Sequence, residues 1–109
     1  ARTRASDTQQ DILTIGELTV DVGARTVRHA EDAIELRPKE FDLLVALARS
    51  AGKVVTREKL MEDVWDEHWF GSTKTLDIHI WALRRKLEGP GAATRITTVR
   101  GVGYRMETA

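Results

Sequence analysis

The apolar residues of one segment near the carboxyl end constrain the fold of this chain most strongly. They are Leu76, Ile80, Leu83 and Leu87. These residues lie four, three and four positions apart, a spacing that places their side chains on one narrow stripe of an α-helix. Gly89-Pro90-Gly91 follows, and such a combination ends a helix. The sequence therefore predicts a helix over about residues 73–87, capped at Ser72 or Thr73, with one buried face.

Two further helices are predicted upstream of this one. Pro38 suits the first turn of a helix, because its missing N–H would have no intrahelical partner there. Apolar residues then recur at helical spacing, and Gly52 suits a left-handed cap, so we expect a helix over about residues 38–51. Thr56 is a suitable N-cap for a second helix that ends near Trp65. Its apolar stripe comprises Leu60, Met61, Val64 and Trp65.

The remaining segments have the alternating pattern of β-strands. Residues 12–36 alternate between apolar and polar with turn residues between the runs, which predicts an antiparallel meander of three or four strands. Val54-Val55 is long enough only for a bridging strand, and residues 95–107 alternate around two glycines as a hairpin would. Strands, three helices and a terminal hairpin together predict an α+β domain, a winged helix-turn-helix.

Length and composition exclude several classes of protein. The chain has 109 residues, 41% hydrophobic and 31% charged, as expected for one ordinary globular domain. It has no cysteine, which excludes disulfides, thiolate metal sites and cysteine nucleophiles. No apolar run approaches the roughly 18 residues of a membrane span, and no signal peptide is visible. We therefore expect a soluble, cytoplasmic domain, cut from a longer chain within a small and polar linker.

Charge is distributed unevenly along a chain whose net charge is zero. Residues 31–71 carry ten negative and six positive side chains, a net charge of −4. Residues 72–105 carry seven positive and two negative side chains, a net charge of +5. This asymmetry indicates that a polyanionic partner would meet the carboxyl-terminal part.

The face of the last helix that lies opposite its buried stripe has an unusual composition. At about 100° per residue it holds Lys74, Ile78, Trp81, Ala82 and Arg85, with Thr75, His79 and Lys86 along one flank. Cations, a hydroxyl, an aromatic ring and an apolar contact for a thymine methyl suit the major groove of DNA. Two alternatives remain open. A single exposed apolar residue is ordinary, and the two large apolar side chains could instead anchor a protein partner.

Two basic features flank this face. Arg84-Arg85-Lys86 is either part of a DNA-binding surface or a solvated helix end that complements the macrodipole, and both can hold at once. Arg100 precedes Gly101 in the hairpin, where a guanidinium could enter a narrow minor groove without obstruction. The alternative is a merely basic hairpin tip.

Catalytic patterns are weak in this sequence. Asp66, Glu67 and His68 cluster, but neither the two-histidine spacing of a zinc protease nor a calcium loop is present. The three histidines fall in different predicted elements, so a hydrolytic triad has no support. We expect no enzyme activity and no cofactor. A metalloenzyme that uses this acidic cluster is the rival hypothesis, and metal uptake would distinguish it.

Six motifs in this chain occur in a recognisable order. They are LRPKEFDLL (36–44), GKVVTREKL (52–60), VW (64–65), KTLDIHI (74–80), LRRKL (83–87) and TVRGVGYR (98–105). From about Leu13 to Arg105 the chain resembles the DNA-binding effector domain of OmpR/PhoB-type response regulators of bacterial two-component systems. The resemblance implies a winged helix-turn-helix with an N-terminal four-stranded antiparallel sheet, three helices and a C-terminal β-hairpin wing. The domain would span residues 12–109, and residues 1–11 would be the interdomain linker.

The resemblance also implies which residues contact partners. Bases or phosphates of double-stranded DNA would be contacted by Lys74, Thr75, Ile78, His79 and Arg84, and the wing contacts would be Thr98 and Arg100. We add Trp81, Ala82 and Arg85 from the exposed face. The family usually has arginine where Lys74 stands and often a basic residue where Ala82 stands, so a bidentate contact and a charge are lost. Trp81 is also unusual there.

The remaining implications concern the whole regulator. A loop between the second and third helices would contact RNA polymerase, through Asp66, Glu67, His68, Trp69, Phe70 and Gly71. Its acidic and aromatic residues suit a protein partner better than a phosphate backbone. A receiver domain, phosphorylated under control of a sensor kinase, would precede this chain. The expected function is sequence-specific transcription regulation by a head-to-tail homodimer on direct-repeat half-sites, without membrane contact. The alternative is a winged helix that binds only protein.

Overall fold

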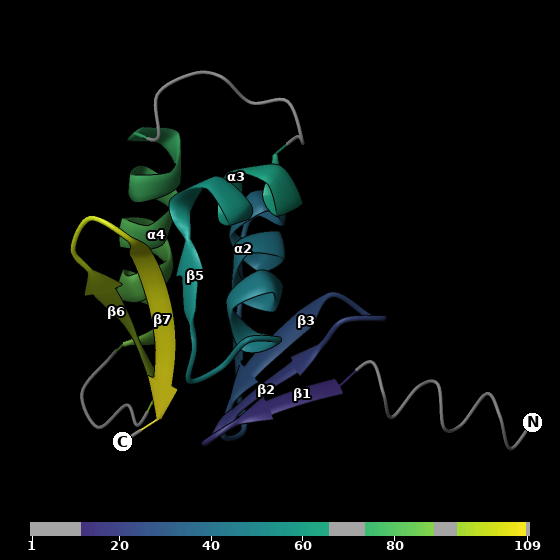
Figure 1. Ribbon diagram of the computed structural model, residues 1–109. Coiled ribbons are helices and arrows are strands. Elements are labelled where there is room, and N and C mark those ends of the chain that lie inside the picture. Colours follow the sequence, from purple (N-terminus) through teal and green to yellow (C-terminus); the bar gives the residue numbers. More distant parts are fainter. Residues whose placement is uncertain (1–11, 66–73, 89–93, 109) are drawn as a thin grey trace, which may run out of the picture.

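The computed structural model describes residues 12–65, 74–88 and 94–108 (Figure 1). The described elements follow in this order: β1 (Ile12–Ile15), β2 (Leu18–Asp21), β3 (Thr26–His29), β4 (Asp32–Ile34), α2 (Pro38–Ala48), β5 (Val54–Thr56), α3 (Arg57–Val64), α4 (Lys74–Leu87), β6 (Thr94–Val99) and β7 (Gly103–Thr108). This is the predicted α+β winged helix-turn-helix.

The first four strands form one antiparallel sheet in the order β1-β2-β3-β4. Gly16 makes the tight turn between β1 and β2 at a φ of 61°, a left-handed conformation that glycine adopts without a steric penalty. Alternate residues of the sheet are buried against the helices, as the period-two pattern predicted. They are Ile15, Leu18, Val20 and Val27.

Helix α2 begins as predicted and ends earlier than predicted. Pro38 occupies its first turn, and the carboxylate of Glu40 accepts a hydrogen bond from the Arg37 N–H at 2.9 Å. The helix ends at Ala48, not Ala51, because the following residues change to tighter hydrogen bonds, such as Ala51 N–H to the Ala48 carbonyl at 3.2 Å. Gly52 has the predicted left-handed conformation, with a φ of 86°.

Helix α3 has the predicted start and end. The Thr56 hydroxyl accepts a hydrogen bond from the Lys59 N–H at 3.1 Å, which is the expected N-cap. The helix ends at Val64, next to the predicted Trp65. The predicted bridging strand is β5, which pairs with β7 in a second sheet of order β5-β7-β6.

The apolar stripe of α4 is buried as predicted. Leu76 and Leu83 have no exposed surface, and Ile80 and Leu87 are 1% and 5% exposed. The helix is described from Lys74 to Leu87, so the predicted cap at Ser72 or Thr73 lies outside the described residues. None of the helices in the described ranges is long and apolar enough to cross a membrane.

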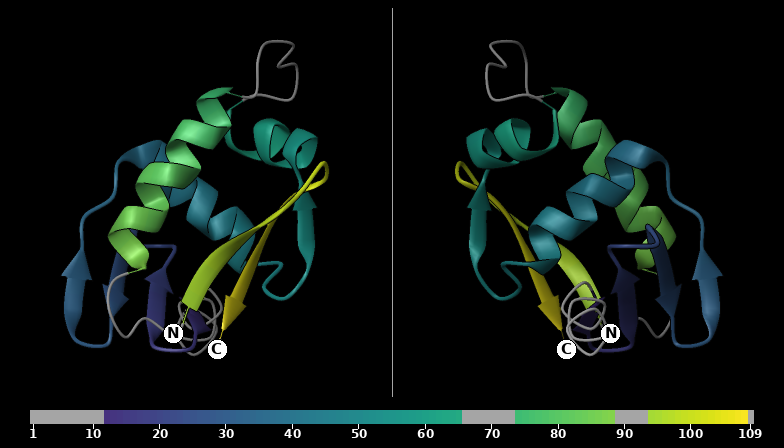
Figure 2. Two further views of the ribbon diagram at one scale, coloured as in Figure 1. Left: turned by 90° about the vertical axis from the view of Figure 1, so that its left-hand side faces the viewer. Right: turned by 90° about the vertical axis from the view of Figure 1, so that its right-hand side faces the viewer.

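The helices place α4 and the hairpin on one side of the molecule. Helix α2 packs against α3, α4 and β7, and it separates the N-terminal sheet from α4 (Figure 1). Helix α4 also packs against β6, and the side views show the helix and the β6–β7 hairpin next to each other (Figure 2). The predicted groove-facing helix and the predicted wing therefore form one continuous surface.

Candidate nucleic-acid interface

The face of α4 opposite its buried stripe carries two large exposed apolar side chains. Ile78 is 64% exposed and Trp81 is 59% exposed. Lys74 and Arg85 are also exposed, and Ala82 is partly exposed. The Arg85 guanidinium lies 4.9 Å from the centroid of the Trp81 ring, a distance suited to a cation–π interaction. Periodicity therefore predicted the orientation of this face correctly.

One flank of that face is directed toward α2. The His79 Nδ1 atom lies 2.7 Å from the Thr75 carbonyl oxygen. The His79 and Trp65 rings meet edge to face, with 5.0 Å between their centroids. If Nδ1 donates that bond, Nε2 of the neutral ring is an acceptor. Lys86 contacts Glu40 of α2, with its Nζ 2.6 Å from the carboxylate. Lys86 is exposed and also forms an ion pair, so its charge at the helix end is partly neutralised by Glu40.

Glu40 is the one buried charged residue among the described residues, with 3% of its surface exposed. Burial alone would raise the pKa of Glu40. The hydrogen bonds from Lys86 and the Arg37 N–H, together with the positive charges of Lys86 and Arg37, outweigh burial and hold the pKa below its ordinary value. The carboxylate therefore stays ionised and fixes the carboxyl end of α4 against the start of α2.

The other flank of α4 is directed toward the hairpin and carries Asp77 and Arg84. The Arg84 Nε donates to the Ile96 carbonyl at 2.9 Å, and an Nη donates to the Thr98 hydroxyl. Arg84 is thus bound to the wing. The alternative interpretation, in which Arg84 is part of a solvated helix end, does not describe this side chain. Of the basic run at the end of α4, only Arg85 makes no hydrogen bond or ion pair with another described element.

The tip of the hairpin presents Arg100 to solvent. The turn is closed by a hydrogen bond from the Val102 N–H to the Val99 carbonyl at 3.0 Å, and Gly101 has a φ of 74°, as in a type II turn. Arg100 occupies the exposed corner of this turn and makes no hydrogen bond or ion pair with any described residue. Thr98 is exposed on the adjoining strand.

Sequence patterns missed a hollow beside this surface. Its lining combines α4 with the start of α2, and it comprises Arg37, Glu40, Ile78, His79, Ala82 and Lys86. Arg37 is an exposed cation that no periodicity connects with α4, because it precedes a different helix. The hollow extends the polar border of the exposed face toward α2.

Other predicted features are not placed by the structure. The predicted polymerase-contact loop, Asp66 to Gly71, lies outside the described residues, as do the acidic residues and His68 of the rival metal site. Among the described residues, no three histidine or acidic side chains are grouped as a metal site would need.

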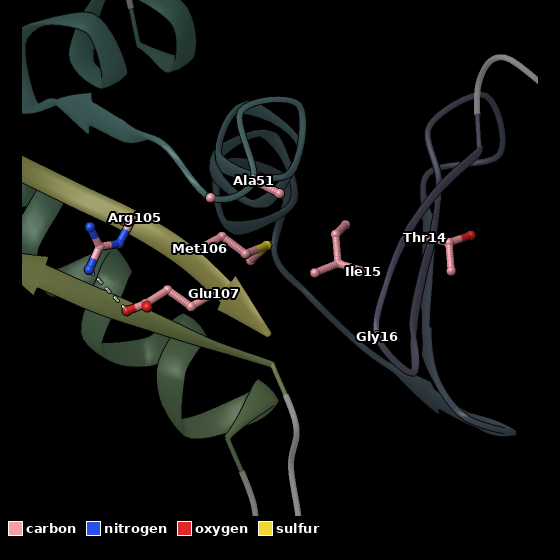
Figure 3. Close-up of a pocket in the computed structure, with 8 residues that line it drawn as sticks. Thr14, Ile15, Gly16, Ala51, Arg105, Met106 and Glu107 are labelled. Carbon is pink, nitrogen blue, oxygen red and sulfur yellow. Dashed lines mark ion pairs between the residues drawn. The ribbon is translucent and has the colours of Figure 1, made fainter. Parts of the chain in front are cut away.

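A second hollow lies between the β1–β2 turn and β7 (Figure 3). Ile15 and Met106 project into it from opposite sides. Its two ionisable side chains, Arg105 and Glu107, pair with each other at 3.4 Å. This arrangement offers no nucleophile next to a base, so it does not resemble a hydrolytic site.

Comparison with known proteins decides the family. The family described as "Transcriptional regulatory protein, C terminal" matches residues 31–106. The chain belongs to this family. Members are DNA-binding regulator domains and not enzymes, in agreement with the sequence-based prediction.

Relatives of the family place the chain among response regulators. It is 42% identical over 103 residues to the sensory transduction protein RegX3 of Mycobacterium tuberculosis, covering 94% of this chain and 45% of RegX3. It is also similar to the response regulator DrrB of Thermotoga maritima, an OmpR/PhoB homolog, with 34% identity and a TM-score of 0.78. That match covers 96% of this chain and 50% of DrrB. The chain is an OmpR/PhoB-type effector domain, and it spans about half the length of these relatives.

A solved family member is bound to DNA. The RstA DNA-binding domain of Klebsiella pneumoniae, in complex with the RstA box, has 31% identity and a TM-score of 0.78. The match covers 88% of this chain and 96% of that domain.

Proposed function

We propose that this chain is the effector domain of a two-component transcription regulator and binds specific duplex DNA, with α4 in the major groove and Arg100 in the adjacent minor groove. One observation carries the proposal. The exposed face of α4 and the basic hairpin tip belong to one surface, whose helix and strands pack directly together. A helix fits the major groove, which is about 12 Å wide, and a neighbouring hairpin can then reach the next groove.

Each group on α4 has a chemical role in this arrangement. Ile78 and Trp81 offer apolar surface to thymine methyl groups, and the hydroxyl of Thr75 and the ring of His79 offer polar contacts with base edges or phosphates. Lys74 and Arg85 contribute positive charge next to the phosphates. Ala82 contributes no charge, and its small side chain leaves room for a base pair to approach the helix.

The wing supplies the second contact. Arg100 projects from the corner of a turn, so its guanidinium can enter a narrow minor groove, whose negative potential attracts arginine. Thr98 accepts a hydrogen bond from Arg84, and its own hydroxyl proton remains available to a phosphate oxygen. The net charge of +5 in residues 72–105 supports the same orientation of the domain on DNA.

The family and the length of its members support a proposal about the larger assembly. We propose that a receiver domain, controlled by a sensor kinase, is joined through residues 1–11, and that two domains bind direct-repeat half-sites head to tail. The first eleven residues are mostly small and polar, as a linker requires. The segment from Asp66 to Gly71 would contact RNA polymerase, because acidic and aromatic side chains suit a protein partner.

The experiment that tests this function is selection from a random pool of duplex DNA with the 109-residue chain. We expect enrichment of one sequence, and the Trp81→Ala variant should bind that duplex more weakly or with altered base preference. Arg28→Ala is the matched control, since it removes an exposed cation from the N-terminal sheet, away from α4. A domain that only binds protein would enrich no sequence, and that result would contradict the proposal.

A further inference from the structure

A tyrosine of the hairpin is tied to α4 by a partly buried hydrogen bond. Tyr104 of β7 is 4% exposed, and its hydroxyl donates to the Asp77 Oδ1 at 2.5 Å. Arg57, the first residue of α3, binds the same carboxylate oxygen, and its guanidinium lies 5.2 Å from the Tyr104 ring. Burial, together with the neighbouring carboxylate, raises the pKa of Tyr104, so the phenol keeps the proton that it donates.

Arg84 makes a second set of contacts between α4 and the hairpin. Its guanidinium lies 5.6 Å from the centroid of the Tyr104 ring and donates to the Ile96 carbonyl and the Thr98 hydroxyl. The planar guanidinium of arginine can donate hydrogen bonds in two directions while it lies against an aromatic ring. We call Arg57, Asp77, Arg84 and Tyr104 the Tyr104 clamp.

The clamp holds one flank of α4 along two helical turns. Asp77 and Arg84 are seven residues apart, so they project on the same side of the helix about 10 Å from each other along its axis. Both therefore face the hairpin, next to the exposed face that carries Trp81. The hairpin cannot shift along α4 without breaking one of these contacts.

The tip of the hairpin is fixed at its other side by β5 and α3. A Cβ atom at Gly103 would lie 2.0 Å from the Val55 carbonyl oxygen, so the backbones approach more closely than any other residue permits. The Arg57 N–H also donates to the Val102 carbonyl at 3.2 Å. Arg57 is therefore a member of the clamp that also contacts the tip, and Arg100 lies only two residues from Val102.

We propose that Tyr104, Asp77 and Arg84 are positioning residues, which set the location of Arg100 relative to the exposed face of α4, and that Arg84 acts through the hairpin and not by direct contact with DNA. The inference rests on the proposed function. A hairpin already fixed in the geometry needed for two grooves does not have to be ordered on binding, and avoiding that entropy loss strengthens binding. A loose hairpin would leave Arg100 able to enter the minor groove only some of the time.

The test is a double-mutant cycle with Tyr104→Phe and Arg100→Ala, using the duplex that the wild-type chain enriches from a random pool. Tyr104→Phe keeps the ring and removes only the hydroxyl that contacts Asp77. We expect it to weaken binding about tenfold when Arg100 is present and less than about twofold when Arg100 is replaced, because coupled residues are not additive. Affinities are compared at a temperature at which thermal melts show every variant to be folded.

Thr97→Val is the matched control. It removes another hydroxyl of the same hairpin, one that donates to Glu107 and makes no hydrogen bond with a described helix, so affinity should not change. The proposal is overturned if Tyr104→Phe binds like the wild type, if its effect is equal with and without Arg100, or if Thr97→Val weakens binding as much. Failure to enrich any duplex would contradict the proposed function itself, before any variant is compared.

Arg84→Lys tests the second positioning residue separately, because lysine keeps the charge and loses the fork. A positioning role predicts weaker binding that again depends on Arg100. If Arg84→Lys binds as the wild type does, or weakens binding equally in the Arg100→Ala background, Arg84 does not act through the wing.

Discussion

Leu83 and Trp81 are two residues apart on α4 and face opposite directions: Leu83 has no exposed surface, whereas Trp81 is 59% exposed. The helical rotation of about 200° between them explains the difference. One helix therefore contributes separately to the core and to the proposed DNA surface, and substitutions can separate the two contributions.

We expect Leu83→Ala to lower the free energy of unfolding by about 2 to 5 kcal/mol, because it leaves a cavity in the core. Trp81→Ala should lower it by no more than about 1 kcal/mol, the size of an exposed cation–π contact with Arg85, while it changes DNA affinity. Urea unfolding measures the first quantity, and fluorescence anisotropy with labelled duplex measures the second. Equal destabilisation by both substitutions would show that the assigned exposed face is wrong.

Arg100→Ala should weaken DNA binding by about 1 to 3 kcal/mol and relax the preference for A·T pairs beside the half-site. Stability should not change, because the side chain is exposed at a turn. Arg95→Ala is the control, since it removes an exposed cation from the other end of the same hairpin. Binding of Arg100→Ala that matches the wild type, with an unchanged circular dichroism spectrum, would mean that the wing has only a structural role.

The exposed apolar side chains of α4 predict sensitivity to thymine methyl groups. Replacing thymines of the selected duplex by deoxyuridine, one position at a time, should weaken binding at one or two positions by about 0.8 kcal/mol for each buried methyl group. Ile78→Ala should abolish that sensitivity, whereas thymines outside the half-site should be insensitive in every variant. The apolar-contact account is contradicted if no thymine responds, or if the response is unchanged in both Ile78→Ala and Trp81→Ala.

The ion pair between the buried Glu40 and the exposed Lys86 predicts how stability depends on pH. The pKa of Glu40 is lower in the folded state than its ordinary value of 4.5, so the unfolded state binds its proton more readily. The stabilisation is fully present above pH 4.5 and is lost as the pH falls through the lowered pKa of the folded state. Glu40→Gln should therefore be destabilised by about 1 to 3 kcal/mol at pH 7.

The same pair supplies its own control. The difference between wild type and Glu40→Gln should shrink as the pH decreases below 4.5, because the wild-type carboxyl then becomes neutral as well. Chemical unfolding at pH 7, 5 and 3 measures this difference. A difference that is constant over the whole range would show that the charge of Glu40 does not contribute to stability.

Local chemistry explains which parts of the fold could be predicted from the sequence. The Thr56 cap and the stripe that contains Leu83 depend on residues within two turns of each other, and spacing reveals such relationships. The exposed position of Trp81 follows from the same periodicity. The type II turn at Gly101 follows from glycine chemistry.

The rest depends on contacts between distant residues, which spacing does not encode. Lys86 and Glu40 are 46 residues apart, and Arg84 meets Thr98 across 14 residues of which five lie outside the described structure. The basic run at the end of α4 therefore appeared uniform in the sequence, although the fold gives its three members three different environments. Helical periodicity predicts that Asp77 and Lys86 lie on opposite sides of α4. It does not predict that Asp77 meets Tyr104 and that Lys86 meets Glu40.

The salt dependence of binding to a duplex with a single selected half-site tests the central claim most directly. If Lys74, Arg85 and Arg100 neutralise roughly three phosphates, the logarithm of the association constant should fall with the logarithm of salt concentration at a slope of about −3. Arg100→Ala should reduce the magnitude of that slope by about one, and Arg28→Ala should leave it unchanged. A slope near zero on the selected duplex would contradict the claim that α4 and the hairpin form a DNA-binding surface.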